Sequence, residues 1–132
     1  MVFHGGERVY ILIVDDKEHF ARQIARALKA VCGEEIDVFT ARSGDDALST
    51  IAENPNDELR ALITNFRLPG MTGGELAQRV AELLPGANIL FVLWTKKIDG
   101  NVMSSSHFRI IRQKDPNIEA FAETIARALL LQ

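Results

Sequence analysis

Short apolar segments alternate with segments of helical periodicity along this chain. Residues 9–14 (VYILIV) form a continuous apolar run rich in β-branched residues, which is typical of a strand buried on both faces. Arg109 and Arg112 flank the last apolar segment, which suits a strand at a sheet edge. The strands expected in chain order are residues 9–14, 36–40, 59–65, 88–94 and 108–112.

Apolar residues between these strands recur at three- and four-residue steps, which predicts amphipathic helices. Helices are expected over residues 17–31, 72–84 and 118–131, and Ser43 is expected to cap a further one, because its hydroxyl can accept from free first-turn amides. Residues expected to face the core are Phe20, Ile24, Ala27, Leu28, Val31, Ala47, Leu48, Ile51, Leu76, Val80, Leu83, Leu84, Phe121, Ile125 and Leu129.

One segment has little periodicity. Residues 96–106 (KKIDGNVMSSS) contain a central Gly and three consecutive serines, so at most a short helix is expected there. Alternation of strands and helices elsewhere implies right-handed crossovers and a parallel sheet. Five such units favour an α/β, flavodoxin-like three-layer (βα)5 fold with a five-stranded parallel sheet in the order 2-1-3-4-5.

Length and composition narrow the class of protein. The 132 residues suit one domain, residues 1–132, with residues 1–8 as an N-terminal tail and no room for an output domain. A content of 47% hydrophobic and 25% charged residues, with a net charge of −3, indicates a globular protein without a nucleic-acid surface. No apolar run approaches the roughly 20 residues of a membrane span, and the single Cys32 fits a reducing compartment, so a cytoplasmic location is expected.

Polar residues follow several of the buried strands. Asp15 and Asp16 end the first, Thr95 ends the fourth, and Asn65 ends the third, at the edge where open parallel sheets keep their ligand crevice. A turn-forming stretch, residues 68–73 (LPGMTG), then follows Asn65, since Pro fixes one backbone angle and Gly frees the next.

This stretch resembles the receiver domains of two-component response regulators. The family's pattern is an apolar strand, an Asp, two variable residues and then Leu/Met-Pro-Gly-Met-x-Gly, and residues 68–73 reproduce it at the right distance from position 65. The resemblance covers residues 10–131. The phosphate-accepting Asp of the family is Asn65 in this chain.

The resemblance implies a role for each polar residue. Asp15 and Asp16 match the acidic pair that holds magnesium, and Thr95 matches the hydroxyl that orients the phosphoryl group. The lysine position falls on Lys114 or on Gln113, because the family joins Lys directly to Pro whereas this chain places Asp115 before Pro116. A further residue, Phe108, is either a switch aromatic or a core residue of the last strand.

Asn65 changes the chemistry that the resemblance implies. An amide is too poor a nucleophile to accept a phosphoryl group. Asn65 also removes one negative charge from the cation site, and a charge pair about 4 Å apart contributes roughly 4 kcal/mol. Weak binding of Mg²⁺ is therefore the most that is expected, and no cofactor is certain. Lys96 and Lys97 follow Thr95, where the family has a small residue. Their ammonium groups either reach Asp15 or Asp16 or point into solvent.

The sequence leaves three hypotheses about function. The first is an atypical, non-enzymatic receiver that is not phosphorylated at Asn65 and binds a protein partner: a histidine kinase, a phosphotransfer protein or a downstream effector, with a homodimer as a further alternative. Its contact surface would be the fourth helix, fifth strand and last helix, anchored by Ile98, Val102 and Met103.

The second hypothesis is an ordinary phosphoacceptor with an engineered Asp-to-Asn change at 65. The third, a remote alternative, is a flavodoxin-like cofactor-binding domain. Such a domain would need a phosphate-cradling glycine motif, and none is found in the sequence.

Overall fold

The five-stranded sheet is parallel throughout and has the expected order. The computed structural model describes residues 8–103 and 107–132, so the predicted tail lies outside the described residues except for Arg8. The strands are β1 (Val9–Val14), β2 (Ile36–Ala41), β3 (Glu58–Thr64), β6 (Leu90–Thr95) and β7 (Ile110–Gln113), in the spatial order β2-β1-β3-β6-β7. This order confirms the predicted flavodoxin-like arrangement.

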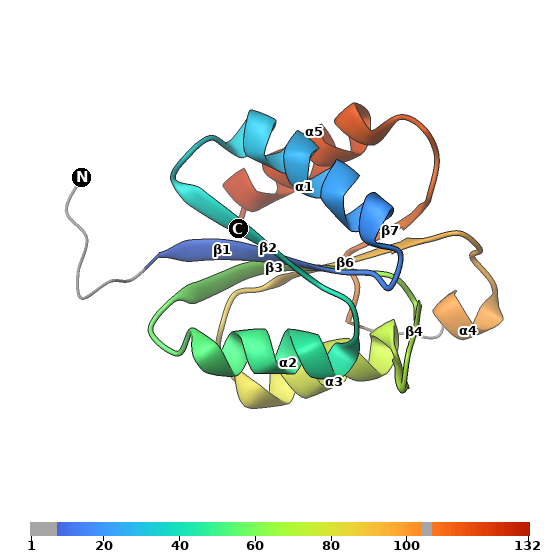
Figure 1. Ribbon diagram of the computed structural model, residues 1–132, viewed down its shortest axis with the longest axis horizontal. Coiled ribbons are helices and arrows are strands. Elements are labelled where there is room, and N and C mark those ends of the chain that lie inside the picture. Colours follow the sequence, from blue (N-terminus) through green and yellow to red (C-terminus); the bar gives the residue numbers. More distant parts are fainter. Residues whose placement is uncertain (1–7, 104–106) are drawn as a thin grey trace.

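Helices cover both faces of the sheet. They are α1 (Glu18–Cys32), α2 (Gly44–Glu53), α3 (Gly73–Leu83), α4 (Gly100–Met103) and α5 (Ile118–Leu130). Figure 1 shows α1 and α5 together on one face, α2 and α3 on the other, and α4 set apart from both pairs. The short α4 confirms that the segment with weak periodicity forms one helical turn at most within its described part. No helix in the described ranges is long and apolar enough to cross a membrane.

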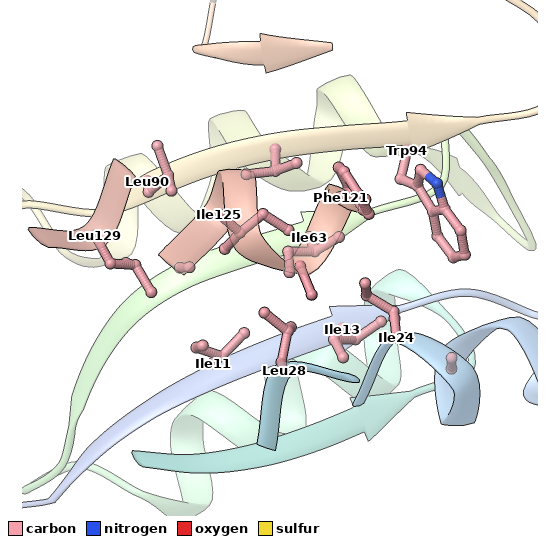
Figure 2. Close-up of a cluster of buried hydrophobic side chains, with 14 residues drawn as sticks. Ile11, Ile13, Ile24, Leu28, Ile63, Leu90, Trp94, Phe121, Ile125 and Leu129 are labelled. Carbon is pink, nitrogen blue, oxygen red and sulfur yellow. The ribbon is translucent and has the colours of Figure 1, made fainter. Parts of the chain in front are cut away.

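The pleat of β1 explains its continuous apolar run. Ile11 and Ile13 pack into the cluster under α1 and α5, whereas Tyr10, Leu12 and Val14 pack into the cluster under α2 and α3. Successive side chains of a strand point to opposite faces, so a strand covered on both faces must be apolar at every position. Figure 2 shows the first cluster, in which side chains from three strands meet those of α1 and α5.

Side chains cap the first turns of α2 and α3. The hydroxyl of Ser43 accepts a hydrogen bond from the Asp46 amide at 3.0 Å, as expected for the N-cap of α2. At α3, Thr72 accepts from the Glu75 amide while the Glu75 side chain accepts from the Thr72 amide, which is a capping box. The predicted helix over residues 72–84 therefore begins one residue later.

Several local expectations were wrong. Val31 and Leu83 were expected in the core but are 45% and 58% exposed, because both lie in the last turn of their helices. The fourth and last strands begin two residues later than expected, at Leu90 and at Ile110, where pairing with Ala61 of β3 and with Val92 of β6 begins. A short antiparallel hairpin, β4 (Arg67–Leu68) and β5 (Met71–Thr72), encloses the predicted turn and was not foreseen.

Candidate functional site

The carboxyl ends of the central strands bring the polar residues together at one edge of the sheet. Asp15 follows β1, Asn65 follows β3, Thr95 ends β6 and Lys114 follows β7. A hollow at this edge, here called the polar pocket, is lined by Asp16, Lys17, Phe20, Asn65, Arg67, Thr95, Lys96, Lys97 and Lys114. The edge is the one at which open parallel sheets carry their ligand sites.

A buried ion pair lies beneath the polar pocket. The Nζ of Lys114 lies 2.5 Å from Oδ2 of Asp15, and the other carboxylate oxygen accepts a hydrogen bond from the Lys17 amide at 2.9 Å. The side chains of Lys114 and Asp15 are 6% and 1% exposed. Both oxygens of Asp15 therefore have a protein partner, which is what a buried carboxylate requires.

Strand register decides which residue reaches this carboxylate. Gln113 pairs with Thr95 at the end of the ladder and its side chain is exposed. The next residue, Lys114, donates its backbone N–H to the Thr95 carbonyl at 2.8 Å and turns its side chain to Asp15. Of the two candidates from the sequence, Lys114 is the one that reaches the pocket.

Two aromatic rings flank the Lys114 ammonium. Its Nζ lies 4.3 Å from the ring centre of Phe20 and 5.1 Å from that of Trp94, which is cation–π distance. Trp94 also stacks on Phe121 of α5, with ring centres 5.4 Å apart and planes 19° apart; Figure 2 shows these rings side by side at one end of the core. Trp94 thus packs under a helix, and Phe20, expected only as a core residue, also contacts the lysine.

Asn65 is held in place by its backbone and its side chain. Its N–H donates to the Val14 carbonyl at 2.9 Å, and its Nδ2 donates to the Arg67 carbonyl at 2.9 Å. The backbone of Gly73 approaches closely from α3, where a Cβ would overlap the Asn65 carbonyl oxygen. The backbone at position 65 is therefore held by its neighbours, and the half-buried amide is tied to the Arg67 carbonyl by one hydrogen bond.

The lysines after β6 do not neutralise the acidic residues. Lys96 and Lys97 are exposed at the rim of the polar pocket, and neither forms an ion pair within the described ranges. The ion pair with Asp15 is formed by Lys114 instead. Of the two readings offered by the sequence, the one in which both lysines point into solvent is correct.

The donor set does not fit a magnesium ion. Among the described residues, no group of three or more His, Cys, Asp or Glu side chains is placed to hold a metal. Asp15 has both oxygens engaged, Asn65 carries no charge, and the Lys114 ammonium lies beside them. Magnesium requires several oxygen ligands with carboxylate charge, and here Asp16 would have to supply that charge by itself.

The surface around α4 differs in one respect from expectation. Val102, predicted as a partner-binding anchor, is 1% exposed and packs against Phe66 and Leu93, because one face of even a single helical turn is buried here. Ile98 and Met103 are 39% and 63% exposed. Phe108 is half-buried against the same small cluster, so it packs as a core residue, and its role as a switch aromatic stays a prediction.

Curated relatives with similar sequences are response regulators. A response regulator receiver protein from Anaeromyxobacter sp. (strain Fw109-5) is 35% identical over 81 residues, which are 61% of this chain and 32% of the relative. A putative two-component response regulator from Arabidopsis thaliana is 28% identical over 83 residues, which are 63% of this chain and 14% of the relative. The chain thus spans a third or less of the length of these relatives.

Solved structures show the same fold over nearly the whole chain. A CheY-like receiver domain protein from Methanospirillum hungatei JF-1 is 22% identical, with a TM-score of 0.76 and coverage of 95% of this chain and 96% of that one. The signal receiver domain of an HD domain-containing protein from Pseudomonas fluorescens Pf-5 is 21% identical, with a TM-score of 0.77 and coverage of 98% and 93%. The family model described as the response regulator receiver domain matches residues 11–106. The chain therefore belongs to the response regulator receiver domains, the signalling modules of two-component systems.

Proposed function

We propose that this receiver domain signals by binding a protein partner and is not phosphorylated at position 65. The observation that carries the proposal is the Asn65 amide, which stands after β3 with its Nδ2 tied to the Arg67 carbonyl. Phosphoryl transfer to this position of a receiver needs a carboxylate oxygen as the nucleophile, and a neutral amide is too poor a nucleophile to replace it.

The charge balance of the pocket supports the proposal. Lys114 already compensates the buried Asp15 carboxylate, so the site needs no bound cation to be electrostatically stable. The Phe20 and Trp94 rings hold the ammonium in place. The pocket therefore favours one arrangement, and we infer that the module presents a constant surface to its partner instead of switching.

The partner class follows from the family. Receiver domains bind histidine kinases, phosphotransfer proteins and downstream effectors, and we assign one of these to this chain, with self-association as the alternative. The contact surface we propose lies over α4, β7 and α5, where the exposed apolar side chains Ile98 and Met103 follow β6. This proposal assigns the domain no catalytic activity of its own.

One observation favours a second candidate. Asn65, Thr95 and Lys114 line the same pocket, and Lys114 also pairs with Asp15. An ordinary phosphoacceptor whose Asp had been exchanged for Asn by design would look the same. In that case restoring the carboxylate would restore full phosphoryl chemistry.

Titration with beryllofluoride and Mg²⁺ tests whether position 65 can bind a mimic of the phosphoryl group. Trp94 is the single tryptophan and lies beside Lys114, so its fluorescence reports on the pocket. We expect no saturable fluorescence change for the native chain, because no carboxylate at 65 can bind the phosphoryl mimic, and a change for Asn65→Asp if the remaining site is competent. A saturable, Mg²⁺-dependent change in the native chain would contradict the proposal.

A further inference from the structure

We propose that two copies of this chain associate through the exposed sides of α1 and α5. The inference goes beyond the proposed function, because this association needs neither the chemistry of position 65 nor the exposed residues around α4. The two helices lie next to each other on one face of the sheet and run in the same direction (Figure 1). The occupant of this face is a second copy because the charges on the two helices are complementary.

The exposed charges of the two helices are opposite in sign. Arg22 and Arg26 lie four residues apart on α1, and both are exposed. Glu119 and Glu123 have the same spacing on α5 and are also exposed. Residues four apart lie on the same side of a helix, so each pair forms a short charged strip. Within the described ranges neither strip has an ion-pair partner, although the helices are neighbours. Both strips are therefore available to another molecule.

A two-fold axis between two copies uses both strips at once. When α1 of one copy faces α5 of the other, the same axis places the second α1 against the first α5, so each contact is made twice. An interface of this kind is closed by its symmetry, which limits the assembly to a dimer.

The relative position of the two helices sets the direction of the contact. Phe20 of α1 and Phe121 of α5 both contact Trp94, with ring centres 5.9 and 5.4 Å from the indole, so the first turns of the helices lie at one level. Leu28 and Leu129 share one cluster further along the helices. If α1 runs parallel to α5 of the other copy, the basic strip meets the acidic strip. An antiparallel placement would set the basic strip against the carboxyl end of α5, which is apolar.

Exposed apolar side chains lie at the carboxyl ends of the same two helices. Of the six large apolar side chains that are exposed in the described ranges, Val31 is near the end of α1, and Leu130 and Leu131 are at the end of α5. Leu130 and Leu131 are 85% and 81% exposed. In the parallel arrangement these ends meet, and burial of the three side chains contributes a hydrophobic term that exposed charges do not provide.

One like charge limits the strength of the contact. Arg127 follows Glu123 by four residues on α5, at about the level of Arg26 on α1. Exposed ion pairs are each weak in water, and this repulsion weakens them further. We therefore expect a reversible dimer that forms at high protein concentration.

Sedimentation velocity over a range of protein concentrations tests the association. The dimer should weaken as salt rises, since exposed ion pairs are screened. Arg22→Glu/Arg26→Glu and Glu119→Arg/Glu123→Arg should each weaken dimerisation by about tenfold or more, because like charges then face each other. A mixture of these two variants should form the dimer again, since every charge contact across the axis then joins opposite signs.

Two further variants serve as controls. Lys96→Glu/Lys97→Glu reverses two exposed charges outside α1 and α5, and it should leave dimerisation within about twofold at constant ionic strength, because isolated surface charges contribute little. Leu130→Gln/Leu131→Gln should weaken the dimer without changing the charge, since both side chains are exposed in the single chain. Equal effects of the lysine reversal and the Arg22→Glu/Arg26→Glu reversal would contradict a specific contact at α1.

Failure of this inference can be distinguished from failure of the proposed function. A native chain that stays monomeric at every concentration, or a mixture that dimerises no better than either reversed variant, would overturn the inference. Loss of the dimer in Ile98→Gln/Met103→Gln, with none in the reversed variants, would place self-association on the surface around α4 and would also overturn it. Phosphorylation of Asn65 would instead overturn the proposed function and leave the dimer unaffected.

Discussion

Lys114 and Asp15 form an ion pair that links the last strand of the sheet to the first. The two residues are 99 positions apart in the sequence, and their side chains are almost completely removed from solvent. A buried charge whose partner is removed has neither water nor a counter-charge, so the pair is strongly coupled even where its net contribution to stability is small.

Removing one member of the pair should be costly. Lys114→Met should lower the free energy of unfolding by about 3–5 kcal/mol, because Asp15 would remain buried with no counter-charge. Urea denaturation followed by circular dichroism gives this value. Asp15→Asn/Lys114→Met should recover part of the loss, since both charges are then gone. A single variant within about 0.5 kcal/mol of the native chain would show that Asp15 is not effectively buried.

Two glycines should respond in opposite directions to the same substitution. At Gly73 a Cβ would overlap the carbonyl oxygen of Asn65, so Gly73→Ala should cost about 1–3 kcal/mol of stability and displace the pocket wall. At Gly100 nothing lies within 4 Å, so Gly100→Ala should stabilise the chain by about 0.4–1 kcal/mol through the unfolded state. Equal effects in thermal or urea unfolding would contradict the close approach at Gly73.

Two neighbouring residues of α4 should differ in their contribution to stability. Val102→Ala should cost about 1–3 kcal/mol, because Val102 packs against Phe66 and Leu93. Met103→Ala should stay within about 0.5 kcal/mol, because Met103 is 63% exposed. Unfolding curves of the two variants check this difference. A larger loss of stability for Met103→Ala would mean that Met103, and not Val102, is the buried residue of α4.

Alkaline pH should weaken the fold through Tyr10. Burial, with a smaller contribution from the Asp57 charge, raises the pKa of Tyr10 above 10.0. The folded chain thus resists ionisation of this ring, so the stabilising effect is fully present below about pH 10 and is lost as pH rises through the folded-state pKa.

The single tyrosine makes this measurable by tyrosinate absorbance. The native midpoint should lie above pH 10 and return to about 10 in denaturant. Tyr10→Phe should reduce the alkaline loss of stability. A native midpoint at or below the denatured one would refute the effect of burial.

The sequence predicts the sheet well because its central strands are buried on both faces. An uninterrupted apolar run such as Val9–Val14 is typical of a strand buried on both faces, and its bounds are as expected. The fourth and last strands were each placed two residues early, because their starts depend on where pairing begins, at Leu90 with Ala61 and at Ile110 with Val92.

The site was predictable in outline and not in its contacts. Strand ends place Asp15, Asn65 and Thr95 at one edge of any parallel sheet. The choice between Gln113 and Lys114 depends on ladder register, which spacing to a proline cannot give. The burial of Val102 and the contact of Phe20 with Lys114 arise from packing between distant segments, for which a single helical turn or a lone aromatic gives no periodic signal.

Intact mass after incubation with acetyl phosphate and Mg²⁺ tests the central claim most directly, with the native chain run beside Asn65→Asp. We expect the native mass to remain unchanged, because the amide cannot accept the phosphoryl group. Mass gain in Asn65→Asp would show that the amide by itself prevents phosphorylation, and no gain would show that the rest of the pocket also lacks competence. A phosphoryl group gained by the native chain and mapped to position 65 or its neighbours would contradict the account.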